Sequence, residues 1–121
     1  MENNRKFIRI PESAEISYRL IENIKTTGAL SKDISKGGLR FFVNEFIPKE
    51  SVLKIKIIIK KLPYSFEVIA KVKWVKKRFA NESFEIGVEF IEVPQKDLQY
   101  LERYIEDINF KKSTRQEVNI P

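Results

Sequence analysis

The stretch from Val52 to Lys60 reads VLKIKIIIK, and its side chains alternate between apolar and basic. Every second residue is a large aliphatic one, and lysines fill most of the positions between them. A repeat of two residues places the apolar side chains on one face of a β-strand and the charged side chains on the other. This stretch therefore predicts a strand with one buried face and one wet face.

The same alternation recurs along most of the chain. It predicts six strands, at residues 14–20, 29–34, 39–43, 52–60, 66–74 and 84–90. Successive strands with one wet face favour antiparallel pairing, and closing such a sheet into a small barrel removes its exposed edges. Trp74 shares the apolar face of its strand with Val72, so we expect its ring in the core.

The repeat changes after Pro94, a residue that suits the first turn of a helix. An apolar stripe with helical spacing follows, formed by Leu98, Leu101, Ile105 and Ile108. We therefore expect an all-β domain with one C-terminal helix, in which a six-stranded antiparallel β-barrel is capped by that helix. The expected boundaries are a mobile N-terminal arm at 1–12, the barrel and helix at 13–110, and a polar tail at 111–121.

The composition excludes several kinds of chemistry. The chain has no cysteine and no histidine, which excludes disulfides, thiolate or imidazole metal ligands, and both Ser-His-Asp and Cys-His catalysis. The carboxylates are scattered among lysines, and no glycine-rich phosphate loop occurs. We expect neither an enzyme nor a protein with a metal or a bound cofactor.

The net charge of +6 favours anionic partners such as nucleotides, nucleic acids, acidic proteins or membrane surfaces. The same lysines also fit a solvated strand face. The N-terminus has no apolar signal core, and the longest apolar run, residues 57–59, is too short to span a bilayer. We expect a cytoplasmic protein without a membrane span.

Two arginines near the N-terminus are candidates for binding an anion. Arg5 and Arg9 lie four residues apart in the sequence RKFIR. A guanidinium group is planar and always charged, it donates in a fork that fits phosphate or a guanine edge, and it stacks on flat rings. The alternative interpretation is two exposed charges on a loose arm.

The sequence DISKGG, which begins at Asp33, separates the second expected strand from the third. The carboxylate can accept hydrogen bonds from guanine, Ser35 offers a hydroxyl, and Gly38 leaves backbone N–H groups approachable. The alternative interpretation is a plain turn, in which Asp and Ser bond their own backbone and glycine adopts a positive φ.

Taken in order, these two stretches resemble the RxxxR and D/NxSxxG motifs of the PilZ domain family. The matching positions are Arg5, Arg9, Asp33, Ser35 and Gly38. The sequence IGVEF at 86–90, ahead of the helix, is also similar to that family. The resemblance covers roughly residues 5–108.

This resemblance implies a small split-barrel domain that binds the bacterial second messenger cyclic di-GMP. Arg5 and Arg9 would contact phosphate and guanine. The fixed side of the site would hold Asp33, Ser35 and Gly38, with Gly37, Lys6 and Arg40 as further candidates. An arm that closes over the ligand would change the surface offered to an unidentified downstream protein.

Two other functions stay open at this point. One is a basic β-barrel that binds nucleic acid, and the other is a PilZ-like protein-interaction module that does not bind the nucleotide. Nucleic acid is not favoured, because the apolar strand faces match a barrel interior better than an exposed aromatic platform. The sequence is compatible with a monomer or a homodimer.

Overall fold

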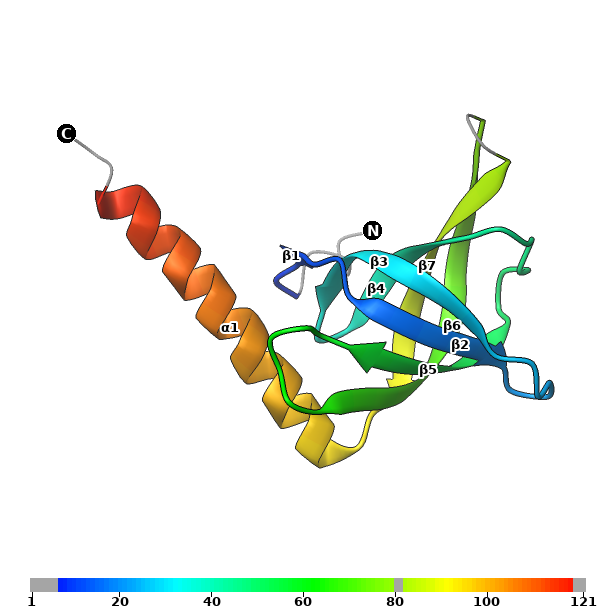
Figure 1. Ribbon diagram of the computed structural model, residues 1–121, viewed down its shortest axis with the longest axis horizontal. Coiled ribbons are helices and arrows are strands. Elements are labelled where there is room, and N and C mark those ends of the chain that lie inside the picture. The colour runs from blue at the N-terminus through cyan, green and yellow to red at the C-terminus, as the bar shows by residue number, and fades with distance from the viewer. Residues whose placement is uncertain (1–6, 80–81, 119–121) are drawn as a thin grey trace.

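The computed structural model describes residues 7–79 and 82–118. Figure 1 shows the strands gathered into one body, with a single long helix beside it. The elements are β1 (Ile10–Pro11), β2 (Glu15–Leu20), β3 (Thr27–Ser35), β4 (Gly38–Val43), β5 (Val52–Ile58), β6 (Ser65–Arg78), β7 (Ser83–Glu92) and α1 (Gln95–Val118).

The six longer strands close into an antiparallel barrel. Their order is β3-β2-β5-β6-β7-β4, and a further pairing between β3 and β4 joins the two ends. The two-residue strand β1 pairs with β3 beside β2, through Ile10 opposite Ile34 and Pro11 opposite Asp33. Each expected strand is present, so the prediction of a six-stranded barrel with a C-terminal helix is confirmed.

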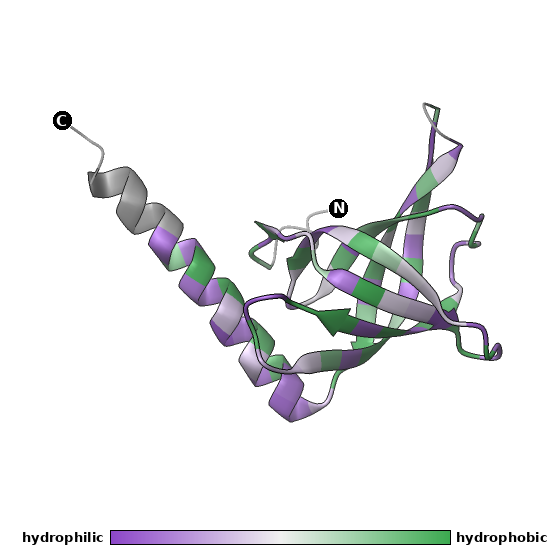
Figure 2. Ribbon diagram, viewed as in Figure 1, coloured by the Kyte–Doolittle hydropathy of each residue, from purple (hydrophilic) through white to green (hydrophobic). Residues whose placement is uncertain are grey.

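The barrel interior holds the core. Figure 2 shows apolar and polar residues alternating along the strands, as a period of two requires. Side chains with no exposed surface come from five different strands: Ile34, Phe41, Ile55, Phe66 and Ile86. Burying one such side chain contributes about 1.5–3 kcal/mol, so this interior is the main source of stability.

Strand β6 runs further than the sequence predicts and changes its register on the way. Val72 lies opposite Val88, but Trp74 lies opposite Gly87, so β6 contains one extra residue between the two pairs. Beyond this irregularity the pairing of β6 with β7 is shifted by one residue, so Trp74 faces the same side of the sheet as Gly87 and not the side of Val72. The expectation that Trp74 shares the buried face of Val72 was therefore wrong.

Helix α1 packs on the barrel with its first turns. Leu101 and Ile105 belong to the core, with exposed fractions of 0% and 3%, and Ile108 packs against it. Figure 1 shows the remainder of α1 projecting away from the barrel. The helix continues to Val118, through most of the stretch that the sequence assigns to a polar tail.

No helix in residues 7–79 or 82–118 carries an apolar stretch of the length that a lipid bilayer requires.

We predict that Leu101→Ala destabilises the domain by roughly 2–5 kcal/mol, because it leaves a cavity where α1 meets the barrel. Phe110→Ala on the same helix is the control, since the Phe110 side chain is 69% exposed. Urea unfolding followed by circular dichroism measures both. Equal losses of unfolding free energy in the two variants would show that Leu101 does not anchor the helix.

Candidate functional site

One row of paired residues crosses the barrel from β1 to β6. Pro11 lies opposite Asp33, Asp33 opposite Arg40, Arg40 opposite Gly87, and Gly87 opposite Trp74. Residues on neighbouring strands that lie directly opposite each other point to the same face of a sheet. Five strands thus contribute one residue each to a continuous row.

This row lies on the outer surface of the barrel. The neighbours of Arg40 along β4, Leu39 and Phe41, both have no exposed surface and point into the core. Because side chains alternate along a strand, Arg40 points outward. Along this row Pro11 is exposed and Arg40 and Trp74 are partly exposed, whereas their neighbours cover Asp33 and Gly87.

The carboxylate of Asp33 lies between two guanidinium groups. Arg9 Nη1 donates to Oδ1 at 2.6 Å, and Arg40 Nε donates to Oδ2 at 2.7 Å, with Arg40 Nη2 donating to the same oxygen. The Asp33 side chain is 9% exposed, whereas those of Arg9 and Arg40 are 35% and 34% exposed. The hydrogen bonds to Asp33 raise the pKa of Arg40 above its ordinary value, against the opposing effect of burial.

The turn between β3 and β4 is held by the Ser35 hydroxyl. Ser35 Oγ accepts a hydrogen bond from Gly37 N at 3.1 Å and donates to the carbonyl of Gly38 at 3.3 Å. Its exposed fraction is 1%. Both hydrogen bonds of the hydroxyl stabilise the turn, as the plain-turn interpretation of the sequence expects.

The two glycines of this turn are needed for close packing. A Cβ on Gly38 would lie 2.1 Å from the carbonyl oxygen of Val88, and a Cβ on Gly37 would lie 2.4 Å from the ring of Phe7. Neither of them has a positive φ, so the left-handed glycine backbone that the plain-turn interpretation includes is not present in this turn. Gly38 lets β4 approach β7, and Gly37 makes room for the arm.

The described part of the N-terminal arm rests on this turn. The Phe7 ring covers Gly37, and the Lys36 ammonium lies 5.4 Å from the centre of the same ring. Lys36 also forms an ion pair with Glu102 of α1 at 2.8 Å. Arg5 and Lys6, both candidates from the sequence, lie outside the described residues.

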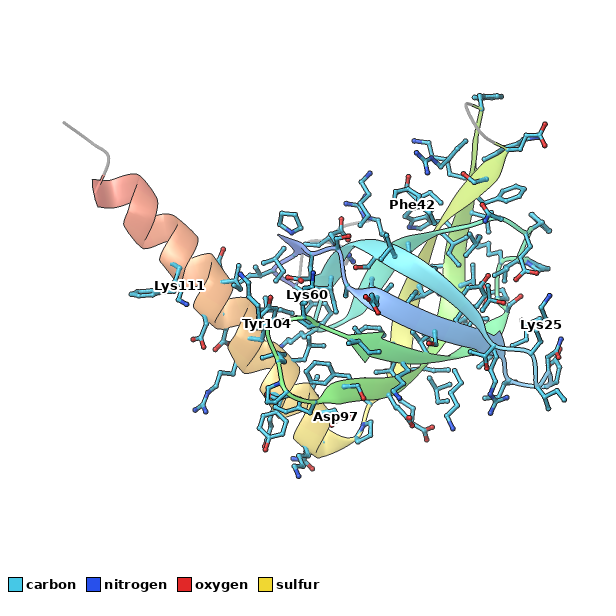
Figure 3. The ribbon with its side chains drawn as sticks, viewed as in Figure 1. Lys25, Phe42, Lys60, Asp97, Tyr104 and Lys111 are labelled. Carbon is cyan, nitrogen blue, oxygen red and sulfur yellow. The ribbon has the colours of Figure 1, made fainter. Side chains whose placement is uncertain are left out.

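A second link joins the arm to α1. Tyr104, labelled in Figure 3, donates its hydroxyl to Glu12 at 2.7 Å. Burial and this hydrogen bond to a carboxylate both raise the pKa of Tyr104. The site is therefore connected to the helix at two points, through Glu12 on one side and Lys36 on the other.

Trp74 is the functional candidate that the sequence reasoning missed. A Cβ on Gly87 would lie 2.3 Å from Trp74 Cε2, so the indole lies directly over this glycine, which stands between Trp74 and Arg40 in the row. Glycine in the middle of a strand often marks a site where another group approaches the backbone closely. Gly87, within the expected strand at 84–90, was the feature of the sequence that could have indicated a side chain packed against it.

The site combines a net positive charge with the flat indole ring of Trp74. Two guanidinium groups face one carboxylate, and an indole lies further along the same row. This arrangement suits an anion that also carries an aromatic base. In the described part of the chain, no group of acidic residues is placed to hold a metal ion.

We predict that Gly87→Ala changes the fluorescence emission of Trp74, the only tryptophan of the chain, because the new methyl group must displace the indole. Gly28→Ala is the matched control, since its Cβ would have no atom nearer than 3.9 Å. Emission spectra of the folded variants test this. An unchanged spectrum for Gly87→Ala would mean that the indole does not rest on Gly87.

Three solved structures with the same fold come from bacteria. The inhibitor of motility MotI/DgrA from Bacillus subtilis superposes with a TM-score of 0.77 at 20% identity, over 89% of this chain and 52% of that chain. YcgR from Escherichia coli in complex with c-di-GMP gives 0.74 at 15% identity, over 93% and 49%. The MrkH–c-di-GMP complex from K. pneumonia gives 0.74 at 16% identity, over 92% and 55%. The chain thus spans about half the length of these proteins.

A search of curated proteins by sequence found no match to the chain. The comparison with family models, in contrast, agrees with the structural comparison. The family model for the PilZ domain matches residues 3–107, which covers the barrel and the packed part of α1. The chain therefore belongs to the PilZ domain family.

Proposed function

We propose that the chain is a receptor domain for cyclic di-GMP, with a binding role rather than a catalytic one. The observation that carries the proposal is the pair of partly exposed guanidinium groups around Asp33 on the outer face of the barrel. The YcgR and MrkH structures, both complexes with this nucleotide and both sharing the fold, support it.

The arginines have donors to spare for a ligand. A guanidinium group has five N–H donors; toward Asp33, Arg9 uses one and Arg40 uses two. The remaining donors fit phosphate oxygens and the O6/N7 edge of guanine. The Asp33 carboxylate would accept hydrogen bonds from the opposite edge of the base.

The other site residues complete the proposed contacts. Trp74 would stack on a guanine, since an indole face suits any flat base. Ser35, Gly37 and Gly38 would let the ligand lie close to the turn. We assign Arg5, and with it Lys6, to the same site from their place in the RxxxR stretch.

We propose further that the arm closes over the bound ligand and passes the change to α1. The support is that the arm and the β3–β4 turn both contact this helix, through Glu12–Tyr104 and Lys36–Glu102. Moving the arm would alter these contacts and the surface beside them, which a downstream protein could detect. The cytoplasmic location expected from the sequence is part of this proposal.

We predict that cyclic di-GMP binds the parent chain with a Kd on the order of 1 μM, about 8 kcal/mol. Arg9→Ala should weaken binding at least tenfold, because losing a charge-assisted contact costs roughly 2–5 kcal/mol. Isothermal titration calorimetry measures both, and quenching of Trp74 fluorescence reports on its stacking.

Arg103→Ala is the matched control, because it removes an exposed arginine on α1 from outside the row. It should bind like the parent. No heat in the parent would overturn the proposal and favour a module that ignores the nucleotide. Tighter binding of a generic single-stranded oligonucleotide would instead favour a nucleic-acid-binding barrel.

We predict that saturating cyclic di-GMP slows amide hydrogen exchange in residues 3–12, because the closed arm loses conformational freedom. Exchange in the loop between β2 and β3, residues 21–26, should stay unchanged as an internal control. Mass spectrometry of peptic fragments resolves the two segments. Equal protection of the arm with and without the ligand would contradict closure while leaving ligand binding itself intact.

A further inference from the structure

The outer half of β6 has a free edge. Pairing with β5 ends at Lys71 opposite Val52, and on that side the last backbone hydrogen bonds join Val72 to Glu50 and Ser51. Pairing with β7 continues to Arg78 opposite Ser83. Among the residues that the structure describes, the segment 73–78 therefore has a strand on one side only, and Figure 1 shows this hairpin extending from the barrel.

This edge, residues 73–78, is strongly basic. Four of its six residues are Lys73, Lys76, Lys77 and Arg78. Lys73 has a long ion pair with Glu89 at 3.7 Å, and the Arg78 guanidinium lies 4.3 Å from the centre of the Phe42 ring.

The positive charge of the edge is largely unneutralised. Glu85 lies opposite Lys76, but its carboxylate pairs with Lys32 at 3.4 Å. Within the described ranges, neither Lys76 nor Lys77 has a carboxylate within ion-pair distance.

Charge decides which strand this edge can accept. A free edge offers unpaired backbone N–H and C=O groups to an incoming strand, and lysines along it are a known defence against unwanted pairing. A second copy that paired antiparallel along the whole segment would set Lys73 opposite Arg78 and would supply no carboxylate, and like charges directly opposite each other destabilise a sheet. An acidic strand would meet the opposite charge at each of these positions.

We propose that the β6 edge at residues 73–78 binds an extended acidic segment of a partner protein by β-strand addition. Backbone hydrogen bonds supply affinity in this mode, and side chains along the edge supply specificity. The lysines thereby exclude neutral and basic strands and admit acidic ones. The inference gives a chemical class to the downstream partner of the proposed receptor, but it does not require cyclic di-GMP to bind.

The test uses three labelled eight-residue peptides and the parent chain, without nucleotide. The first alternates valine and glutamate, the second replaces each glutamate by lysine, and the third keeps the glutamates but replaces the valines by proline. Proline removes the backbone donors and preserves the charge. Fluorescence anisotropy measures binding, and hydrogen exchange locates it.

We predict that the valine–glutamate peptide binds at least about tenfold more tightly than the other two, a difference of about 1.4 kcal/mol. It should slow amide exchange in residues 73–78 and leave β2 unchanged. The double variant Lys76→Glu/Lys77→Glu should lose this binding. The control Lys54→Glu/Lys56→Glu makes the same charge change on exposed residues of β5, a strand paired on both sides, and should retain it.

Four outcomes would overturn the proposal. Equal binding of the proline peptide would show charge attraction without strand pairing, and absence of binding would show that the edge accepts no acidic strand. Concentration-dependent self-association that protects residues 73–78 would identify a second copy as the occupant. A single-stranded oligonucleotide that protects the same segment more strongly than the peptide would assign the edge to nucleic acid.

Discussion

The pairing of β3 with β4 is the constraint on which the rest of the structure depends. Without it the six strands would form an open sheet with two long edges, and with it they enclose the core. The turn that makes this pairing possible is tight, with Ser35 opposite Gly38. Gly38 must lack a side chain, because the Val88 carbonyl of β7 occupies the space that a Cβ would need. The same pairing sets Asp33 opposite Arg40, so the closed fold and the candidate site arise from one contact between strands.

The Asp33 carboxylate then determines the electrostatics of the outer face. A carboxylate that is only 9% exposed needs a compensating charge, and here two guanidinium groups supply it. Both arginines keep about a third of their surface in water, so solvent screening reduces the worth of each ion pair to stability. The main effect of the arrangement is to fix the position of the two guanidinium groups. The cluster keeps a net positive charge, and hydrogen bonds to the Asp33 carboxylate orient the N–H donors of both arginines. A preoriented cationic cluster loses less side-chain entropy when an anion arrives.

Spacing along the chain predicts the elements, whereas register between strands decides the site. Alternation locates all six strands because it depends only on neighbouring residues. It misplaces Trp74 because the shift after Val72 arises from pairing with β7 and leaves no mark on the local pattern. Arg40 stands outside the two sequence motifs and was only a secondary candidate, yet barrel closure places its guanidinium on Asp33. Gly87 carried usable information, since a glycine inside a strand indicates that something packs closely against it.

The position of Arg9 changes how a ligand-driven switch would work. Ile10 and Pro11 pair with β3, and Arg9 donates a hydrogen bond to Asp33, so the described end of the arm is attached to the barrel. A ligand that draws Arg9 toward a phosphate must break this ion pair. Asp33 would still keep its hydrogen bonds from Arg40, so the carboxylate would not be left uncompensated. Moving Arg9 would then exchange one anionic partner for another, and the population of the closed arm would depend on the difference between the ligand contacts in the two states.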